Sequence, residues 1–162
     1  MVPNIKEFEG VSERIATLTL QINRSGILII QVYAPTEATP DDQVEDFYNS
    51  LNETLNKHHE QRTFIIGDFN SKIGKREHEG EEPIGPYGIG TRNERGDRLI
   101  QFAQETRLKI INSYFKKPES SKWTWCAPNG ITKNEIDFIL SDTLRDVLDI
   151  QVIQDLKYDT DH

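Results

Sequence analysis

Two consecutive apolar segments of strand length, joined by a short polar turn, constrain the fold of this chain more than any other feature. Residues 14–22 alternate between apolar and polar side chains, which predicts a strand with one buried face. Residues 27–33 are almost continuously apolar, as in a central strand. Because only residues 23–26 separate the two segments, we expect an antiparallel hairpin. The apolar side of the first strand, expected to face the core, carries Ala16, Leu18, Leu20 and Ile22.

Helical and strand-like segments alternate through the rest of the chain. Apolar residues at helical spacing predict a helix over residues 40–58, with Thr39 as its N-cap and Pro40 at its first position. A long polar loop, residues 71–96, precedes a second predicted helix over residues 97–107. Further strands are expected at 63–67, 108–114, 121–126, 135–140 and 150–153, and a short helix at 141–148. The early and late strands form hairpins, which favours an α/β layer fold with a mixed sheet.

Composition bounds the class of protein. The 162 residues suffice for one domain, taken here as residues 1–162. The 19 basic and 27 acidic residues give a formal net charge of −8, which counts against strong non-specific binding to nucleic acid. A single cysteine, Cys126, excludes a disulfide framework. No apolar stretch reaches the ~18 residues of a membrane helix, and the first residues do not form a secretory signal. We therefore expect an intracellular protein that is neither secreted nor membrane-bound.

The segment Gly67-Asp68-Phe69-Asn70 follows a predicted buried strand. Open α/β sheets bind their ligands at the carboxyl ends of the strands, where Asp68 is expected to lie. Asp68 could accept the proton of an attacking water, and Asn70 could orient that water or hold a phosphate oxygen. The alternative is a turn in which the aspartate bonds to its own backbone.

Three further polar residues fall on or beside predicted strands. Asp137 interrupts an apolar run, and because a buried carboxylate is costly unless it is paired, a histidine ring is its expected partner. Asp161 and His162 could bind a metal ion and donate to a phosphate, respectively. The alternatives are an aspartate bonded to backbone at position 137 and a solvated acidic tail. Carboxylates, an amide and an imidazole are together the groups that metal-assisted phosphodiester chemistry requires.

Five motifs in this order resemble those of the endonuclease/exonuclease/phosphatase (DNase I-like) family. The similarity covers essentially the whole chain and is greatest to the RTE/BovB-type non-LTR retrotransposon endonucleases and the craniofacial development protein 2-like proteins. Residues 92–99 followed by Trp123-Thr124-Trp125 are typical of that branch. The motifs are Val32-Tyr33-Ala34-Pro35, Gly67-Asp68-Phe69-Asn70, Trp123-Thr124-Trp125, Ile136-Asp137-Phe138-Ile139-Leu140 and Asp161-His162.

The resemblance implies a fold, an activity and a site. The fold would be a four-layer α/β sandwich with mixed sheets, and the activity would be Mg²⁺-dependent (or Mn²⁺-dependent) cleavage of DNA by a monomer. The resemblance also implies a nuclear location and a reverse transcriptase in the same polyprotein if the protein is full length. The implied roles are phosphate contact for Tyr33, general base for Asp68 with Asn70 beside it, support for Thr124, pairing of Asp137 with His162, and metal binding for Asp161.

The chain departs from the family pattern at both ends. Complete members begin with a strand bearing an asparagine and a second bearing the main metal-binding glutamate, and they continue past the Asp-His pair. We therefore expect a domain that is incomplete at both ends. A catalytically inactive remnant or binding module and a small-molecule phosphoesterase of the same fold remain alternatives.

Three residues are weaker candidates for contact with DNA. Arg92 and Arg95 lie around the long loop, where they could grip phosphates or form part of a solvated charged loop. Trp125 could stack on a base or pack within the protein.

Overall fold

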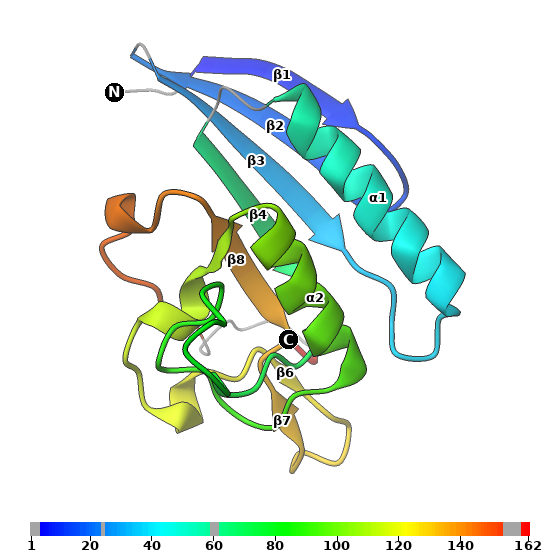
Figure 1. Cartoon of the computed structure of the whole chain (residues 1–162), viewed down its shortest axis with the longest axis vertical. Helices are drawn as coiled ribbons and strands as arrows, with labels where there is room; N and C mark the ends of the chain where they lie inside the picture. Colours follow the sequence, from blue (N-terminus) through cyan, green and yellow to red (C-terminus); the bar gives the residue numbers. More distant parts are fainter. Residues whose placement is uncertain (1–3, 24, 59–61, 154–159) are drawn as a thin grey trace.

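A computed structural model of the chain describes residues 4–23, 25–58, 62–153 and 160–162. Its main feature is a six-stranded mixed sheet with the strand order β1-β2-β3-β4-β8-β5 (Figure 1). Strands β1 to β3 are antiparallel, β3 and β4 are parallel, and β8 runs antiparallel to both β4 and β5. The strands are β1 Asn4–Gly10, β2 Ile15–Ile22, β3 Ser25–Tyr33, β4 Arg62–Asp68, β8 Asp137–Ser141 and β5 Lys109–Ile110. The predicted mixed-sheet α/β fold is confirmed.

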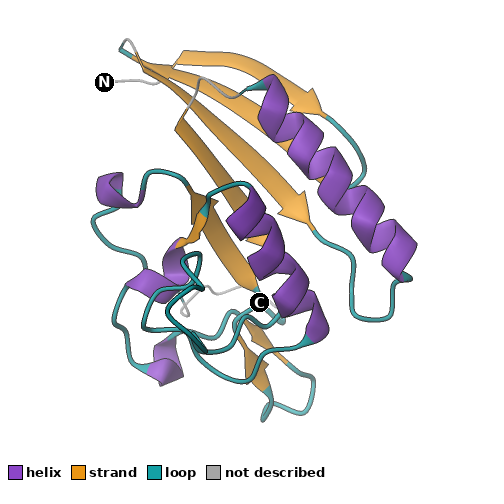
Figure 2. Cartoon of the chain, in the orientation of Figure 1, coloured by secondary structure: helices purple, strands orange, loops and turns teal. Residues whose placement is uncertain are grey.

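Two helices, α1 Asp41–Lys57 and α2 Glu94–Glu105, cover one face of the sheet (Figures 1 and 2). Helix α1 connects the parallel strands β3 and β4, as such a crossover requires. The core between the helices and the sheet includes Leu28, Ile30, Leu51 and Leu99. Burial of each such aliphatic side chain contributes about 1.5–3 kcal/mol to folding. This packing holds strands β3, β4 and β8 in place, and the polar residues Tyr33, Asp68 and Asp137 lie together at one end of these strands.

The hairpin of β2 and β3 is confirmed, although residue 24 of its turn lies outside the described residues. The expected core side of β2 was wrong. Ile15 and Thr17 face the helices, because they pair with Val32 and Ile30 of β3, whose side chains belong to the core. The side with Ala16, Leu18, Leu20 and Ile22 lies on the opposite face of the sheet.

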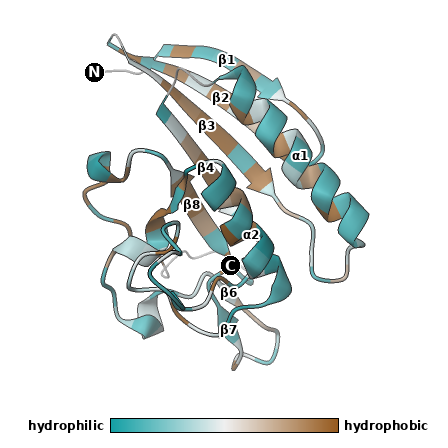
Figure 3. Ribbon diagram, in the orientation of Figure 1, coloured by the Kyte–Doolittle hydropathy of each residue, from teal (hydrophilic) through white to brown (hydrophobic). Residues whose placement is uncertain are grey.

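Hydrophobic residues recur along β2 and β3 (Figure 3), and the face opposite the helices carries Leu18 and Leu20 of β2. Leu18 and Leu20 are only half-buried on it, and Phe8 of β1, which pairs with Leu18, is 72% exposed. Within the described ranges, helices cover only the other face. These ranges therefore form one sheet layer and one helix layer of the expected sandwich.

The starts of both helices differ from prediction. Pro40, not Thr39, is the N-cap of α1 and makes no side-chain capping bond. The Thr39 carbonyl instead accepts a hydrogen bond from Arg95. Helix α2 begins three residues earlier than expected because the Asn93 side chain caps it, with Oδ1 accepting from Gly96 N at 3.0 Å.

The late strands are shorter than predicted. Strand β5 has two residues and passes directly into the 3₁₀ helix Ile111–Tyr114. Residues 121–126 yield only β6 Trp125–Cys126, which pairs with β7 Lys133–Asn134. The predicted helix at 141–148 is a single 3₁₀ turn, Leu144–Asp146, and residues 150–153 are not a strand. None of the helices in the described ranges is both long and apolar enough to cross a membrane.

Candidate active site

The carboxyl ends of β3 and β4 meet the amino end of β8 at one edge of the sheet. Tyr33 is the Cα partner of Asp68 in the parallel pair, and Asp68 is the partner of Asp137 in the antiparallel pair. Because side chains alternate along a strand, all three lie on the face opposite the helices. The register of three strands thus brings together residues that are 104 positions apart in the sequence.

Gly67 permits this register. Its φ is +141°, and a Cβ atom built there would lie 2.0 Å from the carbonyl oxygen of Val32. Only glycine fits at such a close approach of two backbones. The residue before Asp68 therefore has a structural reason to be glycine.

His162 bridges the two aspartates. Its Nδ1 lies 2.9 Å from Asp137 Oδ2, and its Nε2 lies 3.8 Å from Asp68 Oδ2. The expected contact between Asp137 and His162 is therefore present. An ionised carboxylate can only accept a hydrogen bond, so Nδ1 carries the proton that it donates to Asp137. This leaves Nε2 directed toward Asp68.

Asp68 and Asn70 form a tight turn after β4. Asn70 N donates to Asp68 Oδ1 at 2.7 Å, and Asn70 has a φ of +47°. Asn70 Nδ2 donates to the Ala34 carbonyl at 2.8 Å, which ties the turn to the end of β3. Burial raises the pKa of Asp68, the Asn70 N–H opposes this shift, and the neighbouring Asp137 carboxylate raises the pKa further. A carboxylate with a raised pKa is a better proton acceptor near neutral pH.

The hairpin of β6 and β7 holds both Asp137 and the segment that carries His162. Thr124 Oγ1 accepts from the backbone N–H groups of Ile136 and Asp137, each at 3.1 Å. Trp125 Nε1 donates to Asp161 Oδ2 at 3.0 Å, and Cys126 N donates to the Asp161 carbonyl at 2.8 Å. Thr124 and Trp125 thus lie beside the site, as expected, and Asp161 is fixed against β6.

The two candidate arginines have other partners. Arg92 donates to both carboxylate oxygens of Glu81, at 2.5 and 3.0 Å, and to the carbonyls of Ile73 and Lys75. Arg95 donates to Asp41 and to the Thr39 carbonyl. Both guanidinium groups hold loops together, and neither residue lines the hollow described next.

A hollow of about 370 Å³ lies at this site, and the predicted residues that line it are Tyr33, Asp68, Asn70, Trp125, Asp161 and His162. Four polar residues that sequence reasoning missed also line it, Thr36, Glu37, Asn93 and Asn134, and so does Lys72. Lys72 is fixed by Asn93, which accepts from Lys72 N through Oδ1 and donates its own N–H to the Lys72 carbonyl. The sequence signal for the contact between Lys72 and Asn93 was Asn93 as a candidate N-cap of α2. The same Oδ1 atom that accepts from Gly96 N at the start of the helix also accepts from Lys72 N.

The donor set for a metal ion is sparse. In the parts of the chain that the structure describes, no three histidine, cysteine or acidic side chains are grouped closely enough to hold one. Asp68 and Asp137 both face His162, and one oxygen of Asp161 accepts from Trp125. The described residues therefore do not fit a ready-made metal centre.

The fold is that of the DNase I-like endonuclease/exonuclease/phosphatase proteins. The endonuclease domain of TRAS1, a telomere-specific non-LTR retrotransposon, superposes with a TM-score of 0.59 at 13% identity, over 85% of this chain and 53% of that chain. The 3′ phosphatase NExo from Neisseria, bound to a product DNA hairpin, gives 0.58 at 18% identity, over 86% and 58%. The AP endonuclease LMAP from Leishmania major gives 0.54 at 16% identity, over 84% and 49%. These likenesses show the fold.

The chain belongs to the endonuclease-reverse transcriptase family, whose pattern it matches over residues 27–162. It is 36% identical over 130 residues to craniofacial development protein 2 from Bos taurus and, to the same extent, to that from Tragulus javanicus. The match covers 80% of this chain and 22% of each relative, so the chain spans about a fifth of the length of these curated relatives.

Proposed function

We propose that this chain carries the catalytic groups of a DNA endonuclease of retrotransposon origin, which hydrolyses phosphodiesters with the help of a divalent cation. The observation that carries the proposal is the bridging position of His162, with Nδ1 on Asp137 and Nε2 facing Asp68 inside a hollow at the sheet edge. Family membership and the DNase I-like fold support the reaction class, hydrolysis of phosphate esters.

Each residue has a stated role in the proposal. Asp68 accepts the proton of the attacking water, and its raised pKa suits that task. Asn70 orients the water or a phosphate oxygen with its second amide proton, since the first is donated to Ala34. His162, oriented by Asp137 through Nδ1–H, acts as the imidazolium, whose Nε2–H donates to the phosphate and offsets the charge that develops in the transition state. Tyr33, half-exposed at the end of β3, contacts the scissile phosphate.

The cation would be Mg²⁺ or Mn²⁺, and when bound it would offset charge on the phosphate oxygens. Proteins of this family typically depend on a divalent metal. Asp161 is the proposed ligand, and one of its oxygens is shared with Trp125. Mg²⁺ commonly binds through one or two carboxylates plus substrate phosphate, so a sparse site is compatible with weak binding. Selective broadening of the Asp161 and His162 amide resonances by Mn²⁺ is the corresponding direct test.

DNA is the preferred substrate in this proposal. The relatives and structures named above include a retrotransposon endonuclease domain and a protein bound to a DNA hairpin. Trp125 flanks the hollow and is the proposed contact for a base, and Lys72 adds a cation to the lining. Arg92 and Arg95 are weaker DNA contacts because both are already held by carboxylates. In this proposal the protein acts in the nucleus as a monomer, and the full-length protein is a polyprotein that also contains a reverse transcriptase.

The test is nicking of supercoiled plasmid in Mg²⁺, by the chain itself and by the chain preceded by the amino-terminal strands of a family relative. Asp68→Asn and His162→Ala are expected to lower the rate about 10²–10⁴-fold, the usual contribution of acid–base groups. Asp142→Asn and His58→Ala, outside the hollow, are matched controls that retain the parental rate. Failure of both proteins to nick DNA favours an inactive remnant, and cleavage of a small phosphate ester alone favours a phosphoesterase.

A further inference from the structure

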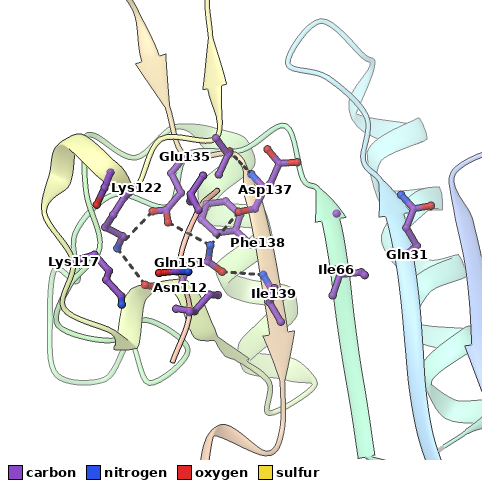
Figure 4. Close-up of a pocket in the computed structure, with 15 residues that line it drawn as sticks. Gln31, Ile66, Asn112, Lys117, Lys122, Glu135, Asp137, Phe138, Ile139 and Gln151 are labelled. Carbon is purple, nitrogen blue, oxygen red and sulfur yellow. Dashed lines mark hydrogen bonds and ion pairs between the residues drawn. The ribbon is translucent and has the colours of Figure 1, made fainter. Parts of the chain in front are cut away.

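A buried polar network lies behind Asp137, on the side away from His162. Lys122, Glu135 and Asn112 are 4%, 6% and 7% exposed, although two of them are ionisable. Lys122 Nζ donates to the carbonyls of Tyr87 at 2.6 Å and Asn112 at 3.2 Å, and it lies 3.8 Å from Glu135 Oε2. The three residues line a hollow of about 360 Å³ (Figure 4).

Asn112 takes the place of a neighbouring strand along part of β8. Strand β5 pairs only with Leu140 and Ser141, which leaves the preceding part of the same edge to other partners. Asn112 Oδ1 accepts from Ile139 N at 2.9 Å, and Nδ2 donates to the Asp137 carbonyl at 3.2 Å. One side-chain amide thus makes the pair of bonds that a strand would make.

Glu135 fixes the orientation of this amide. Its Oε1 accepts from Asn112 Nδ2 at 3.3 Å, and its other oxygen faces Lys122. Because Lys122 also bonds the Asn112 carbonyl, both the backbone and the side chain of Asn112 are held by the same ion pair. Figure 4 shows these contacts as one continuous chain of dashed lines.

The peptide groups of Asp137 are therefore held from both sides. Thr124 accepts its N–H, and Asn112 donates to its C=O. The Asp137 carboxylate points away from Asn112 (Figure 4), and it is this group that contacts His162. Removing the two charges of this ion pair from water costs several kcal/mol per ion. Apolar side chains could fill the same space without that cost, so the need to fill space does not by itself explain why an ion pair is buried here.

We propose that Asn112, which donates to Glu135 and accepts from Lys122, is a positioning residue that aims the Asp137 carboxylate at Nδ1 of His162. The catalytic consequence rests on the proposed nuclease function, whereas the alignment of Asp137 with His162 does not. Loss of the Asn112 amide frees the Asp137 carbonyl, and the carboxylate then no longer holds the imidazole in one tautomer.

The test reads the tautomer of neutral His162 from its ring ¹⁵N chemical shifts at alkaline pH, which requires no turnover. In the parent chain the proton resides on Nδ1. Asn112→Ala is expected to shift the proton toward the mixture of an unpartnered imidazole, as Asp137→Asn does, while amide resonances remote from β8 are retained. Glu135→Gln keeps an acceptor for Asn112 Nδ2 and is expected to retain the parental tautomer.

Ser141→Ala is the matched control for loss of a buried bond on β8, because the Ser141 hydroxyl donates to the Thr63 carbonyl at 2.7 Å and lies four residues from Asp137. It is expected to lower stability without changing the tautomer of His162.

An unchanged tautomer in folded Asn112→Ala overturns the proposal, and if that variant does not fold, Asn112→Ser is read in the same way. A shifted tautomer in a protein that never cleaves DNA refutes the nuclease function and leaves the positioning role intact. In an active protein, Asn112→Ala lowers kcat and leaves KM unchanged.

Discussion

His162 and Asp137 lie 2.9 Å apart, between Nδ1 and Oδ2, although 25 residues separate them in the sequence. This contact orients the imidazole so that its second nitrogen faces Asp68. Two carboxylates on adjacent strands would repel each other, and a histidine placed between them relieves that repulsion when it is protonated. The arrangement explains why an acid can interrupt the apolar sequence of β8.

Glu135→Gln should remove a pH dependence of stability. Burial raises the pKa of Glu135 from 4.5 to about 7, against the opposing effect of Lys122. A carboxyl group with a raised folded-state pKa favours the folded state below the unfolded pKa, and this stability is lost as the pH rises through the folded pKa. The parent should therefore lose on the order of 2–3 kcal/mol between about pH 4.5 and about pH 7.5 relative to Glu135→Gln.

Urea unfolding at a series of pH values measures this difference. Glu53→Gln, an exposed glutamate on α1, is the control and should follow the parent. Parallel pH profiles for the parent and Glu135→Gln would show that Glu135 is ionised throughout the range.

Gly67→Ala should prevent folding or destabilise the protein by about 4 kcal/mol or more, which is at the extreme of single substitutions. The added methyl group would meet the Val32 carbonyl oxygen, and the positive φ adds strain for any side chain. Gly10→Ala is the control, because its added methyl group would have nothing within 4 Å and its φ is not in the left-handed region. Thermal unfolding followed by circular dichroism provides the measurement, and equal midpoints for the two variants would contradict the register of β3 and β4.

Arg92→Ala should lower stability more than it lowers affinity for DNA. In the variant the buried Glu81 carboxylate keeps the Glu77 N–H and the nearby His78 but loses the guanidinium group, which costs on the order of 2–3 kcal/mol. Arg145→Ala, an exposed arginine, should change stability little. Urea unfolding and DNA titration at several salt concentrations separate the two effects. Unchanged stability together with a reduced salt dependence of DNA binding would instead assign Arg92 to phosphate contact.

The sequence predicted those parts of the fold whose signals are local. The hairpin of β2 and β3, the helix α1 and the strand that ends at Asp68 follow from apolar periodicity and turn residues. The buried side of β2 could not be read in this way, because this strand has neighbours on both edges and its apolar side lies on the face opposite the helices. Thr17 is buried on the other face, beneath the helices, because the register of the hairpin makes the core residue Ile30 its cross-strand partner.

The residues of the candidate site could likewise be predicted only where a local sequence motif marked them. Asp68, Asn70 and Asp137 were found because they lie in short motifs at strand ends, and His162 because it directly follows an acidic residue in a motif. Asn112 was missed because its bonds to β8 join segments about 25 residues apart, and an asparagine in a short 3₁₀ helix has no local pattern that reveals them. Asn93 did carry a local signal, since asparagine is a preferred N-cap, but the helix was expected to begin later.

A double-mutant cycle on the rate of Mg²⁺-dependent plasmid nicking, with Asp137→Asn, His162→Ala and the combined variant, tests the central claim most directly. If Asp137 acts by orienting His162, each single substitution lowers the rate about 10²–10⁴-fold and the combined variant is no slower than His162→Ala alone. Independent losses that multiply in the combined variant, or full activity of Asp137→Asn, would contradict the account of the two residues as one catalytic unit.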